Sequence, residues 1–481
     1  MQGIRFIKFL SGPLCAIFIW IFLDLSPGKP QVTLMAGVTV WIALWWFTEV
    51  VDLAVTSLLP LVLLPALGIM DMKTTSMQYM DQVIFLFIGG FILAFALEKW
   101  NLHKRIALNI LSRVGAHPSQ ILFGIMLTAF LISMWISNTA TVMMLFPAVL
   151  SIAETTVSHE KSTRKFASAL LLGLAYSATI GGMSTLVGTP TNMIFASFYS
   201  KELPQEDEIS FARWFIFAMP VALLFFLLTF FVLKTLLVHK SIKLNYTRQE
   251  QVRKLKELGP LGREEKIVMT VFICTALLWF FRADIDTGFF KITGWSNLFG
   301  NPSFIQDSTV AIFMALLLFF IPARKEKKEA IMEWKDTSKL PFHIILLFGS
   351  GFAIAKGFEV SALNTWLAGK LTLFAGMPQL LIILGICLTV TLLSEFASNV
   401  VSIQLMLPVL LSLSVSLNIS PLVLMVPATL AASSGFMLPV ATAPNTIVYG
   451  SGFIKLKHML QAGLILDICF ALIVTIAMMF F

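Results

Sequence analysis

The stretch Ser137-Asn138-Thr139 lies deep inside an apolar run, and Ser398-Asn399-Val400 repeats it in the second half of the chain. Sliding residues 82–147 forward by 261 positions pairs the two motifs without a gap. The same shift pairs Phe87 with Phe348, Gly90 with Gly351, Phe91 with Phe352, Ala94 with Ala355, Glu98 with Glu359 and Pro147 with Pro408. A second block, offset by 253 positions, pairs Ala175 with Ala428, Gly182 with Gly435, Thr189 with Thr442 and Asn192 with Asn445. The sequence therefore predicts two homologous halves.

The composition indicates an integral membrane protein, because 58% of the residues are apolar and only 12% are charged. A helix needs roughly 20 apolar residues to cross a bilayer, and the chain has many apolar runs, among them 54–70 and 82–98. We predict an all-α polytopic protein with about 11 spans. The net charge of +8 is explained by Lys and Arg in cytoplasmic loops, so no nucleic-acid partner is predicted.

Basic residues lie on both sides of the apolar run 119–152. Lys99, Lys104, Arg105 and Arg113 precede the run, and Lys161, Arg164 and Lys165 follow it. If basic loops face the cytoplasm, this run begins and ends on the cytoplasmic side, which predicts a re-entrant hairpin with the Ser-Asn-Thr motif at its tip. Its repeat, 378–413, should then enter from the outer face. The same rule predicts, for a multi-pass protein of the cell (inner) membrane, an N-terminus in the cytoplasm and a C-terminus on the outer side.

Each predicted hairpin is followed by a span that carries a polar break. Gly188-Thr189-Pro190-Thr191-Asn192 interrupts the apolar run 166–199, and Ala441-Thr442-Ala443-Pro444-Asn445 interrupts 421–449. Gly and Pro at such positions unwind a helix, which frees carbonyls for a small cation and exposes amides to an anion. A single Ser-Asn-Thr is more often a helix-packing contact, but two matched copies with breaks are typical of secondary transporters.

The two halves define the predicted domain organisation. The predicted ranges are 1–80 for N-terminal scaffold spans, 81–238 for the first repeat, 239–266 for a cytoplasmic linker and 267–481 for the second repeat.

Several motifs together resemble those of the divalent anion/sodium symporter family, which includes the mammalian carriers for citrate, dicarboxylates and sulfate. They are Trp45-Trp46-Phe47-Thr48-Glu49, Ser57-Leu58-Leu59-Pro60, Phe87-Ile88-Gly89-Gly90-Phe91, both Ser-Asn motifs, Gly188-Thr189-Pro190 and Phe436 through Thr442. The resemblance covers nearly the whole chain. It implies a homodimer in the lipid bilayer, in which a transport domain moves like an elevator against a scaffold domain.

The resemblance also implies two Na⁺ sites and a substrate site between them. The first Na⁺ site would comprise Ser133, Ser137, Asn138 and Gly188, and the second Ser394, Ala397, Asn399 and Ala441. The substrate would contact Asn138, Thr139, Thr189, Ser398, Asn399, Val400, Thr442 and Ala443. None of these residues is Lys or Arg, so bound Na⁺ would supply the charge that balances an anion. Val400 and Ala443 depart from the family pattern, where Thr and Pro are usual.

The sequence thus predicts a carrier that couples Na⁺ to the uptake of a small divalent anion, most simply a C4-dicarboxylate such as succinate, malate or fumarate. Alternatives within the fold are a dicarboxylate exchanger and a citrate or sulfate carrier. An anion channel or a non-transporting membrane subunit is the alternative from another class. No nucleophile, base and orienting group occur together, so no enzyme is predicted. Glu395, next to Ser394, either tunes the second ion site or faces a vestibule.

Overall fold

The computed structural model describes residues 2–115, 117–156, 161–238, 248–286, 291–323 and 329–479. Within these ranges the regular structure is helical apart from one small antiparallel hairpin of β1 (Ile285–Asp286) and β2 (Lys291–Ile292) and an isolated bridge between Pro322 and Ala330. Nine helices in the described part of the chain are long and apolar enough to cross a membrane. The predicted all-α polytopic class is therefore confirmed.

The N-terminal region contains α1 (Gln2–Phe22), α2 (Pro30–Thr48), α3 (Leu53–Thr56), α4 (Leu59–Ala66), α5 (Met72–Met77) and the 3₁₀ helix η1 (Gln78–Met80). The apolar run 54–70 forms two short helices, α3 and α4, instead of one long helix. Pro60, in the first turn of α4, explains part of this difference, because proline lacks the amide hydrogen that would continue the hydrogen bonding from α3. The Asp52 side chain accepts a hydrogen bond from the Ala54 amide at 2.8 Å and so caps α3.

The remaining helices follow the two halves in order. The first half holds α6 (Gln82–Lys99), α7 (Leu102–Leu111), α8 (Pro118–Ser133), α9 (Asn138–Thr156), α10 (Lys161–Met183), α11 (Pro190–Glu202) and α12 (Phe211–Leu237). In the predicted linker, residues 239–247 lie outside the described residues, and α13 (Arg248–Glu257) follows them. The second half holds α14 (Arg263–Phe280), α15 (Asp307–Phe320), α16 (Phe342–Ser361), α17 (Leu363–Leu371), α18 (Gln379–Phe396), α19 (Asn399–Leu417), α20 (Pro421–Ala432), α21 (Ala443–Tyr449) and α22 (Leu456–Ala477). Its short 3₁₀ helices are η2 (Trp295–Leu298), η3 (Pro302–Phe304), η4 (Trp334–Lys339) and η5 (Thr372–Phe374).

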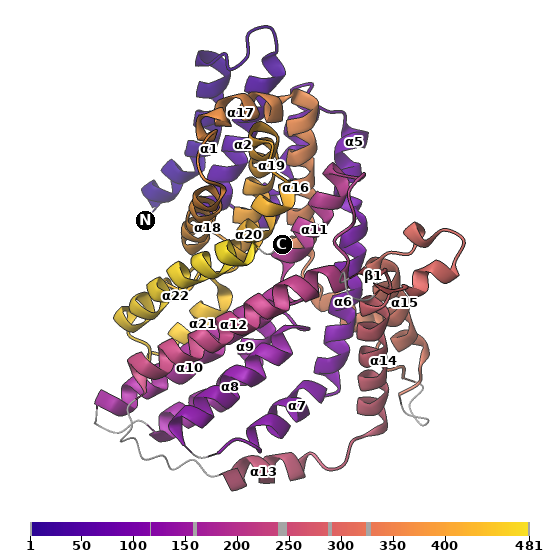
Figure 1. Cartoon of the computed structure of the whole chain (residues 1–481), viewed down its shortest axis with the longest axis vertical. Helices are drawn as coiled ribbons and strands as arrows, with labels where there is room; N and C mark the ends of the chain where they lie inside the picture. Colours follow the sequence, from indigo (N-terminus) through magenta and orange to yellow (C-terminus); the bar gives the residue numbers. More distant parts are fainter. Residues whose placement is uncertain are drawn as a thin grey trace.

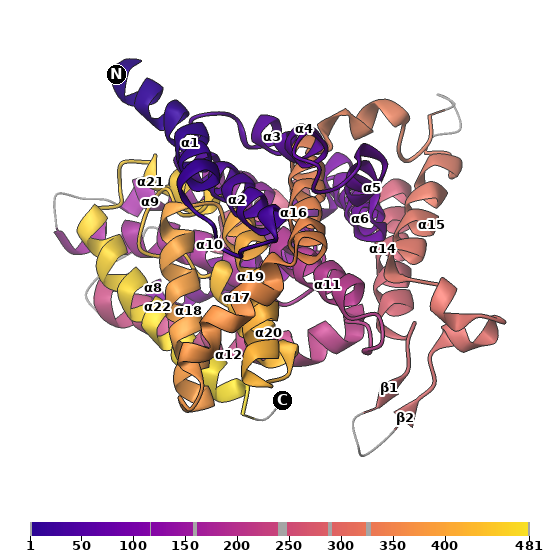
Figure 2. The same ribbon diagram turned by 90° about the horizontal axis from the view of Figure 1, so that it is seen from above.

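The two halves interlock through the short helices that follow the polar breaks. In the first half α11 packs against α19 and α20, and in the second half α21 packs against α9 and α10. Helix α10 also contacts α8 and α12, so it lies at the centre of this bundle. Figures 1 and 2 show α14 and α15 on the side of the molecule opposite α8 and α22. Each broken segment is therefore held by helices of the other half.

Two repeat-equivalent residues touch each other at the junction of the halves. The rings of Phe87 and Phe348 are both buried, and their centroids lie 5.4 Å apart at an angle of 63°. Equivalent residues of a duplicated fold meet only where the axis that relates the halves passes between them. The contact therefore supports the duplication in space as well as in sequence.

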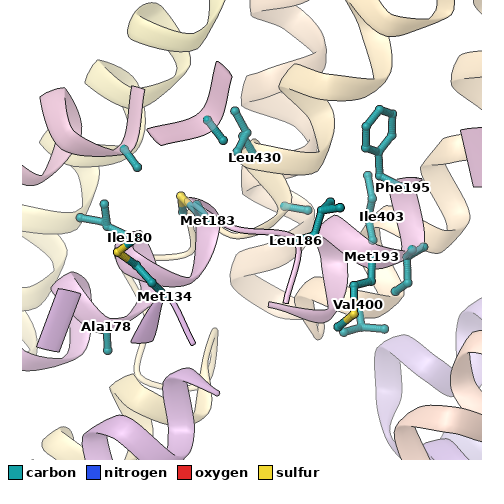
Figure 3. Close-up of a cluster of buried hydrophobic side chains, with 14 of the residues drawn as sticks. Met134, Ala178, Ile180, Met183, Leu186, Met193, Phe195, Val400, Ile403 and Leu430 are labelled. Carbon is teal, nitrogen blue, oxygen red and sulfur yellow. The ribbon is translucent and has the colours of Figure 1, made fainter. Parts of the chain in front are cut away.

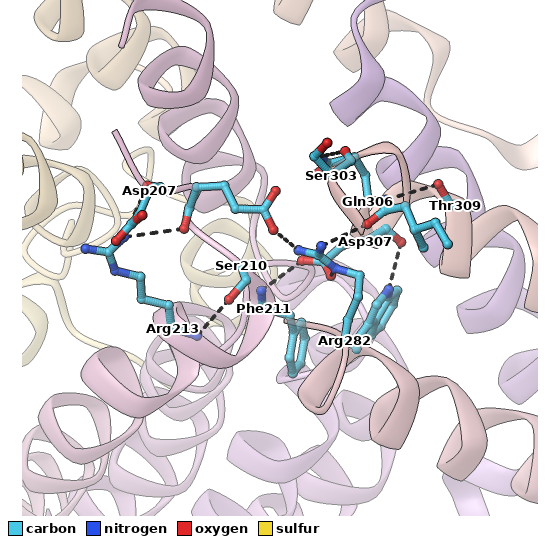
Figure 4. A network of polar contacts seen from close by, with 12 residues as sticks. Asp207, Ser210, Phe211, Arg213, Arg282, Ser303, Gln306, Asp307 and Thr309 are labelled. Carbon is cyan, nitrogen blue, oxygen red and sulfur yellow. Dashed lines mark hydrogen bonds and ion pairs between the residues drawn. The ribbon is translucent and has the colours of Figure 1, made fainter. Parts of the chain in front are cut away.

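An ion network at the edge of the bundle fixes the loop before α12 to the helices α14 and α15 (Figure 4). The Arg282 side chain is only 3% exposed and donates to Asp307 at 2.5 Å. Arg282 also pairs with Glu208 and donates to the Ile305 carbonyl at 2.9 Å. The second Asp307 oxygen accepts from the Phe211 amide at 2.8 Å. One buried guanidinium thus joins three segments of the chain.

Candidate substrate and ion site

Both Ser-Asn motifs stand at the start of a helix. Helix α9 begins at Asn138 and α19 begins at Asn399, directly after the turns that end α8 and α18. In each turn the carbonyl of the motif serine accepts the first helical hydrogen bond, from Thr141 in one half and from Ser402 in the other, both at 3.0 Å. The free amides of the first turn carry partial positive charge, which favours an anion beside them.

In the first half, three of the four residues predicted for an ion site lie together. The buried Ser133 hydroxyl donates to the Asn138 side-chain oxygen at 2.8 Å. Gly182, near the end of α10, lies against that oxygen: a Cβ on Gly182 would stand 2.2 Å from it. Gly188 packs in turn on the Gly182 backbone, where its own Cβ would be 2.6 Å from the Gly182 carbonyl oxygen. The fourth residue, Ser137, lies in the turn and accepts from the Ala140 amide at 3.3 Å.

The second half repeats this arrangement. The Ser394 hydroxyl lies 2.7 Å from the Asn399 side-chain oxygen and 2.5 Å from the Ala432 carbonyl oxygen. Gly435 occupies the position of Gly182, and a Cβ there would be 2.9 Å from the Ala441 Cβ and 3.4 Å from the Ser394 carbonyl oxygen. Ala397 is the C-cap residue of α18, three residues after Ser394. The structure therefore brings a serine, an asparagine and a glycine together in both halves, whereas Ala441 stands in the second half where Gly188 stands in the first.

Two buried asparagines hold the breaks in their folded course. The Asn192 amide nitrogen donates to the carbonyls of Gly182, Met183 and Thr185 at 3.2, 3.2 and 2.8 Å. The Asn445 nitrogen donates to Gly435 at 3.0 Å and Leu438 at 3.2 Å. These asparagines are repeat equivalents for which the sequence predicts no role, and their matched position three residues after Thr189 and Thr442 is the signal that could have found them.

The predicted substrate residues fall into three groups by exposure. Asn138, Thr139, Ser398, Asn399 and Thr442 are half-buried, Ala443 is exposed, and Thr189 and Val400 are buried. Figure 3 draws Val400 with Met193 and Ile403 in one cluster of buried apolar side chains. The Val400 side chain, 9% exposed, therefore packs as part of the core.

A small cavity of about 30 Å³ reaches the first motif. Its lining includes Ser137, Ala140, Val187 and Gly90, but none of the residues predicted to contact substrate. A volume of that size has room for only a few water molecules. Of the residues in the first motif, Ser137 lines this cavity, whereas Asn138 and Thr139 do not.

The oxygen atoms gathered in each half suit a monovalent cation. Hydroxyl, amide and carbonyl oxygens are hard ligands, and a cation held without a carboxylate is held weakly enough to be released. The Ser133 hydroxyl can rotate, so that its oxygen and that of Asn138 both face an ion. The same holds for Ser394 and Asn399. The residues present thus fit Na⁺ as a transported ion.

Comparisons with known proteins identify the family of this chain. The sequence profile described as the sodium:sulfate symporter transmembrane region matches residues 8–481. The chain belongs to the sodium:sulfate symporter family. The family to which the sequence motifs pointed is therefore confirmed.

Two relatives of this symporter-family chain carry a specific name. The sodium-dependent dicarboxylate transporter SdcS of Staphylococcus saprophyticus is 37% identical over 484 residues, which cover 99% of this chain and 91% of that protein. SdcS of Staphylococcus aureus is 37% identical over 478 residues, which cover 98% of this chain and 90% of that protein. Both relatives are transporters.

A solved structure shares the fold of this family member. The crystal structure of the Alcanivorax borkumensis YdaH transporter, described as having an unusual topology, matches with a TM-score of 0.54 and 14% identity. The match covers 84% of this chain and 86% of that one. At this identity the likeness shows a common fold alone.

Proposed function

We propose that this chain couples Na⁺ to the uptake of a C4-dicarboxylate, such as succinate, malate or fumarate, across the cell (inner) membrane. The strongest supporting observation is the pair of matched contacts, Ser133 to Asn138 at 2.8 Å and Ser394 to Asn399 at 2.7 Å, each at a helix start beside a break. The relatives named sodium-dependent dicarboxylate transporters support the class of anion and the coupling ion.

In this proposal each half holds one Na⁺. The first ion takes oxygens from Ser133, Ser137, Asn138 and Gly188, and the second from Ser394, Ala397, Asn399 and Ala441. The dianion contacts the half-buried motif residues between the ions, together with Thr189, Thr442, Val400 and Ala443. The two Na⁺ charges and the first-turn amides of α9 and α19 balance the two carboxylates. Since each ligand improves the affinity of the other by the same factor, the Na⁺ gradient drives accumulation of the anion.

The movement that we propose is of the elevator type, in a homodimer with a cytoplasmic N-terminus and an outer C-terminus. The region 1–80 contributes most of the scaffold, and the two hairpins with their following broken helices travel as the transport domain. The basic loops of the sequence support this orientation. The packing of α11 on α19 and α20, and of α21 on α9 and α10, supports movement of these helices as one body.

A competition assay tests the proposal. Uptake of labelled succinate into proteoliposomes is measured with and without Na⁺, against unlabelled malate, citrate, 2-oxoglutarate and sulfate. We expect succinate uptake only with Na⁺ and competition by malate. Competition by sulfate alone would show that the chain carries sulfate, the anion in its family's description. Na⁺-independent counterflow would show that it is an exchanger.

A further inference from the structure

Glu395 is a buried carboxylate that connects the second hairpin to the second break. It lies in α18 directly after Ser394 and is 0% exposed. Its two oxygens accept from the amides of Met437 and Leu438 at 2.7 and 2.8 Å. These amides belong to the segment between α20 and α21 that also carries Ala441. Glu395 therefore connects two parts of the second predicted ion site: Ser394 is its neighbour in α18, and Ala441 lies in the segment whose amides it binds.

A second carboxylate, Asp467 of α22, lies beside Glu395 within hydrogen-bonding reach. Asp467 is 3% exposed, and apart from the Glu395 carboxyl neither of its oxygens has a hydrogen-bond partner among the described residues. Helix α22 comes this close because Gly463, one turn earlier, lies on the break: a Cβ there would be 2.4 Å from the Phe436 carbonyl oxygen. The Asp467 carboxyl group thus lies in a tightly packed interior next to a second acid.

The surroundings of the pair supply no positive side chain. In the described part of the chain, no Lys, Arg or His forms an ion pair with either carboxylate. The titratable group that also faces the pair is Tyr176 of α10, and its hydroxyl donates to the Phe436 carbonyl at 2.7 Å. Two adjacent carboxylates in an apolar interior repel each other and lose their hydration, so both stay ionised only if a cation lies between them; otherwise they share a proton.

We propose that Glu395 and Asp467 form a further Na⁺ site, distinct from the two sites that the motifs predict. Those two sites use neutral oxygens, whereas this one offers two carboxylates, which hold a cation more tightly. An ion between these carboxylates joins α18 to α22 and, through Glu395, to the 436–438 segment. It thus fixes the position of the second break, next to which the second motif site forms. The inference rests on the proposed Na⁺ coupling, to which it adds an ion that assembles the site before substrate binds.

Equilibrium binding of radioactive Na⁺ to the purified protein in lipid nanodiscs tests this site without transport. We expect Asp467→Asn, which keeps the shape of the side chain, to lose one class of bound Na⁺ or to weaken it at least about tenfold. The matched control is Glu359→Gln on α16, which removes a carboxylate that pairs with Lys356 at 2.6 Å and is half exposed; it should bind Na⁺ like wild type. If Asp467→Asn does not fold, Glu395→Gln is measured with the same expectation.

The outcomes separate this inference from the proposed function. Wild-type protein that binds no Na⁺ contradicts both. Wild-type Na⁺ binding that is unchanged in folded Asp467→Asn contradicts the further site alone. An infrared band of a protonated carboxylic acid that disappears in Asp467→Asn, but does not respond to Na⁺, would show that the pair holds a proton and would overturn the proposal.

Discussion

The side-chain oxygen of Asn138 lies 2.2 Å from the point that a Cβ on Gly182 would occupy. The contact places the start of α9 directly on α10, and it is possible only because position 182 has no side chain. Asn138 also accepts from Ser133 at 2.8 Å, so its orientation is fixed from two sides. The geometry of the first ion site therefore depends on the absence of a side chain at position 182.

Gly182→Ala should disable the first ion site without unfolding the protein. The new methyl group collides with the end of the Asn138 side chain, which must turn away and lose its contact with Ser133. We expect the half-saturating Na⁺ concentration for uptake to rise at least about tenfold. Gly369→Ala on α17 is the control, because nothing lies within 4 Å of its new methyl group. Equal Na⁺ dependence of both variants would refute this role of Gly182.

Asn138→Ala and Asn399→Ala should each abolish Na⁺-driven uptake, because each removes a side-chain oxygen from one half of the site. Their stabilities should differ. Asn138→Ala leaves the buried Ser133 hydroxyl without its acceptor, at a cost of about 1–3 kcal/mol in the free energy of unfolding. Asn399→Ala should cost less, since the Ser394 hydroxyl keeps the Ala432 carbonyl oxygen at 2.5 Å. Unfolding of both variants, followed with uptake, checks the pair; wild-type uptake by either would remove that asparagine from the site.

Val400→Thr should change the preference among dicarboxylates more than the Na⁺ dependence. The new hydroxyl either reaches the anion or stays in the apolar cluster with Met193 and Ile403, where a hydroxyl without a partner costs about 1–3 kcal/mol. Val401→Thr makes the same chemical change at the next, fully buried residue and should affect stability only. The competition profile of the two variants is the measurement. An unaltered profile for Val400→Thr would place its side chain away from the substrate.

Arg282→Ala should destabilise the protein strongly. It leaves Asp307 buried without its positive partner, which costs about 3–5 kcal/mol in the free energy of unfolding. Arg213→Ala, in the same network drawn in Figure 4, should cost no more than about 1 kcal/mol, because its ion pair with Asp207 is exposed. Thermal and denaturant unfolding of both variants in detergent measures the difference. Similar losses for the two would show that burial does not govern this network.

Local signals in the sequence were sufficient to predict the features that depend on neighbouring residues. The helix starts at Asn138 and Asn399 follow from short polar motifs inside apolar runs, and the breaks before α11 and α21 follow from Gly and Pro. Contacts between distant segments gave no such signal. The approach of Gly182 to Asn138 and of Asp467 to Glu395 depends on how α10 and α22 pack, and side-chain periodicity within one helix does not report packing between helices.

The division of 54–70 into α3 and α4 shows a limit of hydropathy alone. The only polar side chains in the run are those of Thr56 and Ser57, yet Pro60 lacks the amide hydrogen that would continue the hydrogen bonding of a single helix. Length and composition likewise do not distinguish a spanning helix from one arm of a hairpin. Helices α18 and α19 meet the criteria for spans, although the sequence predicts them to enter and leave from one face.

The central claim is that the two matched Ser-Asn sites couple Na⁺ to dicarboxylate uptake. The most direct test is the accumulation of labelled succinate in proteoliposomes under an inward Na⁺ gradient, with K⁺ replacing Na⁺ in the parallel sample. We predict accumulation above the external concentration with Na⁺ in wild type, none with K⁺, and none in Asn138→Ala or Asn399→Ala with either ion. Equal uptake with Na⁺ and K⁺ by wild-type protein would contradict the coupling.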